Sequence, residues 1–294
     1  METRVSENGK DVITLFRELA YDYFDRTGTL CIWKISYLCQ VLRMVSIRSG
    51  LQHNFLYRSR DAREETSQGP DPSKKFSYSG RLVFVKTQEM TVYPALYGKV
   101  KRDTQLKGTC AIQYIGKSSY CFLQELQLAS TGELVCVCST LMVLIDKATR
   151  RPVHFEPKFV EQSLPFVKGG TVSFMRPIVD QPPSYSYRYS ISVPASDMDS
   201  NYHVNQSNYI KYCMDCAAFG ARDHAYSLFT QDIASYPIKS LSVLYIGESR
   251  SGQILDVISW EDREKPYIIY FIIRRGKDDI YQSIVRFNVD KSKL

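Results

Sequence analysis

Residues 197–209 read Asp197-Met-Asp199-Ser-Asn201-Tyr-His203-Val-Asn205-Gln-Ser-Asn208-Tyr209, and apolar positions at helical spacing follow from about 206 to 226. Acidic, amide and imidazole side chains occupy alternate positions just before this predicted helix. In an extended loop, such an alternation projects Asp199, Asn201 and His203 to one side. The stretch therefore predicts a polar loop that leads into a helix.

The same order of elements occurs earlier in the chain. Residues 12–24 have the alternation of a strand and end at the turn Asp25-Arg-Thr-Gly28. From residue 30 to about 49, apolar residues recur at intervals of three and four, which predicts a buried helix. A shift of 174 residues places Asp25 on Asp199. The sequence therefore predicts an internal duplication.

Strands complete each half of the predicted duplication. Alternating patterns between turn signals predict strands at 81–92, 96–103, 109–116, 119–129 and 134–146, and then at 185–193, 238–247, 252–260, 267–274 and 280–289. Residues 58–80 are polar and predict a long loop. We expect a first domain over 1–160, a linker over 161–184 and a second domain over 185–294. A helix across an antiparallel sheet, twice in tandem, predicts an α+β fold with one merged sheet.

The charge of the chain is unevenly distributed. Of its net charge of +7, all belongs to residues 1–160, where 23 basic residues face 16 acidic ones, because the two signs balance at 15 each in 161–294. A basic half suits an acidic partner or a phosphate-bearing ligand, and equally a solvated face without any partner. No nucleic-acid-binding motif accompanies these charges, so we do not expect nucleic acid as a ligand.

Cysteine usage and apolar runs indicate the class of protein. The eight cysteines lie in apolar periodic segments without the paired spacing of a zinc site, so we expect buried, reduced thiols and no metal. Cys213-x-x-Cys216 has the spacing of a redox pair but lies inside a predicted helix, where no helix start stabilises a thiolate. No apolar run is long enough for a membrane span, and the acid-rich first residues lack a leader pattern. We expect a cytoplasmic protein, unless a leader has been removed.

The loop over 197–209 has two interpretations from its residues alone. A neutral His203 can orient a water or donate a proton, Asn201 can donate to an oxyanion, and Asp199 can orient a partner group. Alternatively, Asp199 and Asn201 form a turn and a helix cap while His203 packs. The residue types leave both interpretations open.

Asp199-x-Asn201-x-His203-Val-Asn205-x-x-x-Tyr209 closely resembles the motif of the fatty acyl-ACP thioesterases, which are plant and bacterial enzymes. Tyr245-Ile-Gly-Glu248-Ser249 is similar to the family's Tyr-Arg-Arg-Glu-Cys segment. Leu144-Ile-Asp-Lys-Ala-Thr149-Arg150-Arg151-Pro152 resembles the segment that closes the first domain of these enzymes. The resemblance implies a tandem double hotdog, in which each hotdog is a long central helix wrapped by an antiparallel β-sheet.

The resemblance also implies a set of site residues. Its catalytic members are Asp199, Asn201, His203 and Glu248, supported by Asn205, Ser249 and Tyr209. Glu248 would activate water or attack the thioester, while His203 and Asn201 would polarise its carbonyl. Ser249 replaces the family's cysteine, which leaves the carboxylate mechanism intact and argues against a papain-like one, and Gln206 replaces the second Asn of the motif. No metal or organic cofactor is implied.

The function that the resemblance implies is hydrolysis of fatty acyl thioesters in fatty acid biosynthesis, which releases a fatty acid and a carrier thiol. The carrier would be acyl carrier protein, which is acidic, or coenzyme A, and the first half would bind the acyl chain while the second catalyses. The alternative is a non-catalytic acyl-thioester-binding hotdog. A hotdog dehydratase is disfavoured because its Asp-x-x-Pro-x-His signature is absent. The sequence leaves open the chain length, the carrier and whether the protein forms a homodimer.

Overall fold

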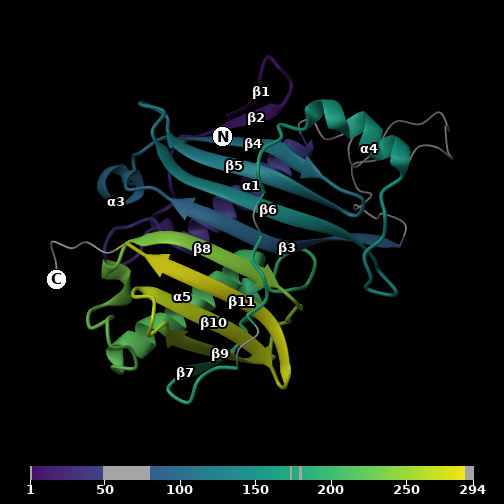
Figure 1. Ribbon diagram of the computed structural model, residues 1–294. Coiled ribbons are helices and arrows are strands. Elements are labelled where there is room, and N and C mark those ends of the chain that lie inside the picture. Colours follow the sequence, from purple (N-terminus) through teal and green to yellow (C-terminus); the bar gives the residue numbers. More distant parts are fainter. Residues whose placement is uncertain (1, 49–79, 173, 179–180, 289–294) are drawn as a thin grey trace.

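A single eleven-stranded antiparallel sheet organises the computed structural model, in the order β1-β2-β4-β5-β6-β3-β8-β11-β10-β9-β7 (Figure 1). The structure describes residues 2–48, 80–172, 174–178 and 181–288. Nearly all of the predicted loop over 58–80 lies outside these residues. The merged α+β architecture predicted from the sequence is confirmed.

Each half supplies one long helix and a run of strands. The first half contains β1 (Glu2–Val5), β2 (Asp11–Phe16), α1 (Ile32–Arg48), β3 (Arg81–Val92), α3 (Ala95–Lys99), β4 (Leu106–Ile115), β5 (Ser119–Leu128), β6 (Leu134–Asp146) and α4 (Pro157–Ser163). The second half contains β7 (Tyr187–Ser192), α5 (Gln206–Arg222), β8 (Ile238–Tyr245), β9 (Ile254–Glu261), β10 (Ile268–Arg275) and β11 (Asp278–Phe287).

The two halves join through β3 and β8. These strands pair antiparallel from Thr87 opposite Leu244 to Thr91 opposite Ser240. Helices α1 and α5 lie together on one face of the sheet (Figure 1). Both helices bury a wide apolar face in one continuous core, as the predicted periodicity requires. The hotdog arrangement therefore occurs twice within one sheet.

Two predicted strands are wrong in part. The segment predicted as a strand over 96–103 begins with helix α3, because Pro94 starts a helical turn and Ala95 and Leu96 then point into the core. The strand predicted over 12–24 ends at Phe16 and is followed by a 3-10 turn over Tyr21–Tyr23. In both cases a short helical turn interrupts residues of high strand propensity.

The segment between the halves crosses the sheet on the face opposite the helices (Figure 1). Lys168 N donates to Ile112 O at 2.7 Å, and Gln113 Nε2 donates to Thr171 O at 3.1 Å. Further along, Ile178 N donates to the side chain of Gln282 at 2.7 Å. Helix α4 lies at the start of this segment, where the composition predicted only a linker. The crossing ties both halves together, while the predicted domain boundaries stay a prediction.

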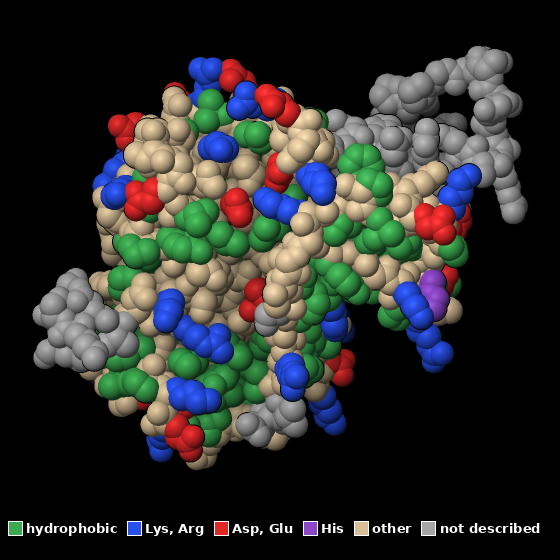
Figure 2. Space-filling model, turned by 45° about the horizontal axis from the view of Figure 1, so that its top comes forward, with side chains coloured by type: hydrophobic (Ala, Val, Ile, Leu, Met, Phe, Trp, Pro, Cys, Tyr) green, Lys and Arg blue, Asp and Glu red, His purple; other side chains and the backbone are tan. Residues whose placement is uncertain are grey.

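The packing determines where the cysteine thiols and the charged side chains lie. All eight cysteines are buried and free, and burial raises the pKa of Cys216 to about 12, which argues against a redox role for the Cys213–Cys216 pair. In the face shown in Figure 2, Lys and Arg side chains are scattered over both halves among hydrophobic and acidic ones. Among the described residues, no helix is long and apolar enough to cross a membrane.

Candidate active site

The loop that carries His203 is a tight turn with a counterpart in the first half. Asp199 N donates to His203 O at 2.8 Å, and the Asp199 carboxylate accepts from Asn201 N at 2.8 Å. Asp25 makes the same two contacts with Thr29 and Thr27, at 2.9 and 2.8 Å. The predicted shift of 174 residues therefore holds at the level of single hydrogen bonds, as it does in the sequence.

The loop is anchored to the start of α5. Asn205 caps the helix, since its Oδ1 accepts from Ser207 N at 3.0 Å, and its own N–H donates to Asp197 O at 2.9 Å. The buried Asp197 carboxylate accepts from Lys211 Nζ at 2.8 Å and from the Tyr212 hydroxyl at 2.6 Å. These contacts fix the loop relative to the helix.

Glu248 follows β8, at a place where the chain leaves the sheet. The N–H groups of Ile246 and Gly247 both donate to Ile280 O at 2.9 Å. A Cβ at Gly247 would lie 3.0 Å from Ile280 Cγ2, so a larger residue would require a shift of a few tenths of an ångström in this contact with β11. Ser249 O accepts from Val204 N at 2.9 Å, which joins the Glu248 segment to the His203 loop.

These connections bring the imidazole and the carboxylate into contact. His203 Nε2 lies 3.1 Å from Glu248 Oε2, and the two side chains are 23% and 24% exposed. Arg150 Nη2 lies 2.6 Å from Glu248 Oε1, and Arg275 Nη1 donates to Glu248 O at 2.6 Å. An imidazole and a carboxylate that touch each other and remain open to solvent can transfer protons to and from a bound ester and a water.

The supporting residues lie behind this pair. Ser249 is fully buried, and its hydroxyl lies 2.8 Å from that of Tyr209. Tyr209 also accepts the Ser249 N–H at 2.9 Å and stacks on Tyr281. Burial raises the pKa of Tyr209, so its hydroxyl stays protonated. Ser249 is therefore placed to hold the Glu248 segment and is shielded from any substrate.

The predicted catalytic residues thus occupy different positions. The structure brings His203 and Glu248 together, while the Asp199 carboxylate holds the turn and the Asn201 side chain is exposed at its tip. Tyr202, between Asn201 and His203, has φ of 61° and is 73% exposed. The loop therefore forms the turn that was one of its two interpretations. The catalytic roles of these residues stay predictions.

Sequence reasoning missed two residues of the site. Arg150 lies in the segment that resembles the close of the first domain, and its contact with Glu248 was not predicted. Asp197 begins the polar stretch before α5, and its role in anchoring the loop to that helix was not predicted. The available signals were the two consecutive arginines in the turn after β6 and an acid placed before a helix. Among the described residues, no group of three His, Cys, Asp or Glu could hold a metal ion.

The first half has a position equivalent to the His203–Glu248 site, with different side chains. Arg102 and Gln253, which are 151 residues apart, accept equivalent backbone hydrogen bonds in the two halves. The same spacing places Tyr97 at the position of Glu248. The Tyr97 hydroxyl donates to Ile238 O at 2.8 Å and is therefore engaged by the second half.

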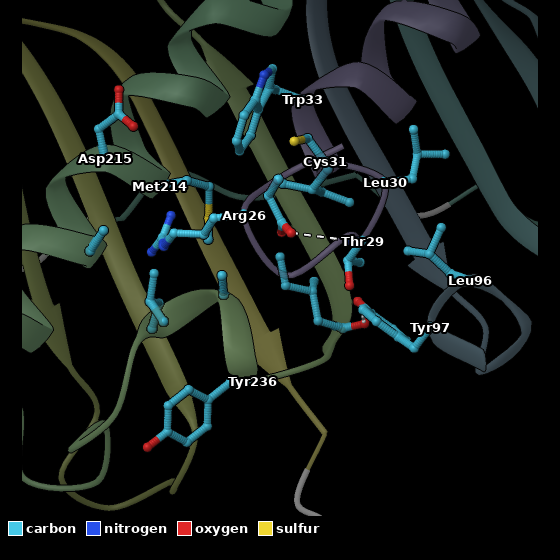
Figure 3. Close-up of a pocket in the computed structure, with 16 residues that line it drawn as sticks. Arg26, Thr29, Leu30, Cys31, Trp33, Leu96, Tyr97, Met214, Asp215 and Tyr236 are labelled. Carbon is cyan, nitrogen blue, oxygen red and sulfur yellow. Dashed lines mark hydrogen bonds between the residues drawn. The ribbon is translucent and has the colours of Figure 1, made fainter. Parts of the chain in front are cut away.

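A hollow of about 70 Å³ lies at this matching position (Figure 3). Thr29 stands there in place of His203, and Trp33 and Met214 supply part of its apolar wall. Asp215 of α5 also lines it, and burial raises the pKa of that carboxyl. The matching position has neither the imidazole nor the carboxylate of the pair, so the acid–base groups occur in the second half only among the described residues.

Comparisons with known proteins identify the C-terminal domain and the fold. Residues 181–288 match the family model of the acyl-ACP thioesterase C-terminal domain. The fold is similar to that of a 12:0-ACP thioesterase from Umbellularia californica, with a TM-score of 0.71, 13% identity, and coverage of 96% of this chain and 95% of that one. It is also similar to an acyl-ACP thioesterase from Bacteroides thetaiotaomicron, with a TM-score of 0.69, 14% identity, and coverage of 97% and 100%.

A comparison of the sequence with curated proteins gave no match. The structural likeness extends over both halves, whereas the family match covers the half that contains both His203 and Glu248. The chain has the tandem hotdog fold throughout, and its C-terminal domain, residues 181–288, matches the acyl-ACP thioesterase family.

Proposed function

We propose that this protein hydrolyses fatty acyl thioesters to a free fatty acid and a carrier thiol, with His203 and Glu248 as the catalytic pair. One observation carries the proposal: the two side chains lie 3.1 Å apart, each about a quarter exposed to solvent, inside the domain that matches the thioesterase family. Two loops that are 45 residues apart in the sequence meet there, through the bond between Val204 N and Ser249 O.

The chemistry that these groups support is attack of water on the thioester carbonyl. Glu248 accepts a proton from the water as its oxygen bonds to the carbonyl carbon. His203 and the Asn201 amide donate hydrogen bonds to the oxyanion that forms. When the carbon–sulfur bond breaks, the proton is returned to the leaving thiolate, which leaves a fatty acid and a thiol. Asp199 holds the loop that presents Asn201 and His203.

The surroundings of the pair favour an acidic carrier. Arg275 Nη1 donates to Glu248 O at 2.6 Å, and Lys86 Nζ donates to Tyr245 O at 3.2 Å, just before the Glu248 segment. Positive charge around the site would attract the acidic acyl carrier protein that the family uses. The phosphates of coenzyme A would be attracted as well. We therefore propose acyl-ACP as the main substrate, with acyl-CoA as the carrier to compare against it.

We further propose that the reaction belongs to fatty acid biosynthesis in the cytoplasm. The eight buried and free cysteines support a reducing compartment, in which thiols stay unpaired. The second candidate function is a non-catalytic protein that binds acyl thioesters. The open contact between His203 and Glu248 favours hydrolysis, because a binding protein has no use for an acid–base pair at its solvent boundary.

The test is thiol release from panels of acyl-ACP and acyl-CoA of different chain lengths. His203→Ala and Glu248→Gln should each lower the rate by at least about a hundredfold with the fold retained, because acid–base groups contribute on the order of 10² to 10⁴. His154→Ala and Glu264→Gln are matched controls at exposed positions and should leave the rate unchanged. Acyl ligands that bind without turnover on any carrier would support the binding protein instead.

A further inference from the structure

The carboxylate of Glu248 has a partner on each oxygen. Oε2 contacts His203 Nε2 at 3.1 Å, and Oε1 contacts Arg150 Nη2 at 2.6 Å. A carboxylate held through both oxygens cannot rotate about its terminal bond without losing one partner. The side-chain orientation that reaches His203 is therefore defined by a residue from the other half of the chain.

The sheet topology explains why these two segments meet. Strands β6 and β8 pair antiparallel with opposite sides of β3, so they run in the same direction and their C-terminal ends point toward the same end of the sheet. β6 ends at Asp146 and β8 ends at Tyr245. The turn after β6 therefore lies beside the segment after β8, which carries Glu248.

The turn after β6 is built to present Arg150. The Asp146 carboxylate accepts from Thr149 N at 2.7 Å and from Ala148 N at 3.1 Å, and Arg150 N donates to Asp146 O at 2.8 Å. The hydrogen bond from Thr149 N is also the main cause that lowers the pKa of Asp146. Arg150 has φ of 57°, in the left-handed region that L-residues rarely adopt. A strained backbone at a residue that contacts the candidate base suggests a functional constraint.

A contribution to folding stability does not explain the ion pair between Arg150 and Glu248. The Arg150 side chain is 46% exposed and that of Glu248 is 24% exposed, and pairs this open to water contribute little to folding. Arg275 already holds the backbone of the same segment, through Glu248 O. What Arg150 adds is the direction of the side chain, and a guanidinium is suited to that because its planar fork fixes a carboxylate better than an ammonium does.

We infer that Arg150 is a positioning residue of the active site, which holds the Glu248 carboxylate against His203 and makes the first hotdog a part of the catalytic site. The inference rests on the proposed function for its kinetic consequence. It assigns to the first half a direct role in catalysis, beyond binding of the acyl chain.

The kinetic test compares Arg150→Ala with Arg151→Ala. Arg151 is the next residue, its side chain is exposed, and its replacement removes the same charge. Because a misplaced catalytic group can cost up to about a hundredfold, Arg150→Ala should lower kcat by about tenfold to a hundredfold and change KM by less than about threefold. Arg151→Ala should stay within about twofold of the parent in both constants. A loss confined to KM, or an equal loss in both variants, would mean that Arg150 attracts substrate rather than orients Glu248.

A double variant tests whether Arg150 acts through Glu248. In the Glu248→Gln background, Arg150→Ala should cause no further loss, because there is no carboxylate left to orient. Arg150→Lys should retain part of the activity, and free guanidinium at millimolar concentration should restore part of it to Arg150→Ala. A full additional loss in the double variant contradicts the inference.

A readout independent of turnover separates this inference from the proposed function. The chain has four histidines, so selective labelling gives a simple imidazole NMR spectrum. The His203 signals should shift in Glu248→Gln and in Arg150→Ala, and stay unchanged in Arg151→Ala. If the parent protein hydrolyses no thioester but these shifts occur, the function is wrong and the placement of Glu248 by Arg150 stands. If Arg150→Ala leaves the His203 signals unchanged, the inference is wrong whatever the activity.

Discussion

Replacement of Ser249 by alanine tests the mechanism most directly, because this residue stands where the family has a cysteine. Its side chain is fully buried, and its hydroxyl lies 2.8 Å from that of Tyr209. Tyr209 also accepts the N–H of residue 249 at 2.9 Å, and that backbone bond survives in the variant. Only one buried hydrogen bond is therefore lost.

The expected magnitude follows from this count. One hydrogen bond between neutral groups contributes about 1 kcal/mol, so the midpoint of thermal unfolding should fall by about 2–4 °C. Glu248 and His203 keep their contact, so kcat/KM should fall by less than about tenfold, the factor that corresponds to 1.36 kcal/mol. By contrast, removal of a serine nucleophile lowers kcat by on the order of 10⁶ in a serine protease. The losses of activity that the two mechanisms predict for Ser249→Ala therefore differ by several orders of magnitude.

The assay is thiol release at saturating acyl substrate, with circular dichroism and thermal unfolding of each variant as the measure of the fold. Ser249→Cys restores the family residue and should behave like the parent, while Glu248→Gln should be nearly inactive. If Ser249→Ala abolishes turnover in a folded protein and Glu248→Gln remains active, a serine nucleophile replaces the carboxylate mechanism.

The remaining predictions concern the anchors of the site and the state of buried groups. Asp197→Asn should lower the free energy of unfolding by about 1.5–3 kcal/mol in urea titrations, because the hydrogen bonds of the buried carboxylate to Lys211 and Tyr212 lose their charge. The exposed ion pair of Asp232 with Arg26 is the control, and Asp232→Asn should cost less than about 1 kcal/mol. Burial raises the pKa of Asp215, so ionisation of this carboxyl destabilises the folded state as the pH rises through the folded pKa. Asp215→Asn should therefore raise the midpoint of thermal unfolding at pH 7, but not at a pH below about 4, where the carboxyl is protonated in both states. An equal gain at both pH values would show another cause. The eight buried thiols should react with a disulfide reagent only after unfolding, and rapid labelling of Cys213 or Cys216 in the native protein would contradict their placement inside α5.

The sequence by itself determined the duplication, both long helices and most of the strands. Helical and strand periodicities are local properties, so α1 and α5 could be predicted from the spacing of residues such as Ile35 and Tyr212, which are both fully buried. The loop before α5 could also be predicted, because Asp199 and Asn205 form turns and caps through contacts a few residues away. The resemblance of two separate segments to the thioesterase family identified His203 and Glu248 as partners, and their roles stay predictions.

Only the tertiary structure decided how the distant segments meet. Helix α3 appears where strand propensity predicted a strand, because Ala95 and Leu96 complete the core of the first half. The contact between Arg150 and Glu248 depends on the C-terminal ends of β6 and β8 pointing toward the same end of the sheet, which follows from the pairing of both strands with β3. Pairing partners are chosen by packing over long sequence separations, which no local pattern encodes. Contacts between residues of the two halves can therefore be recognised only in the folded protein, where β3 and β8 are paired.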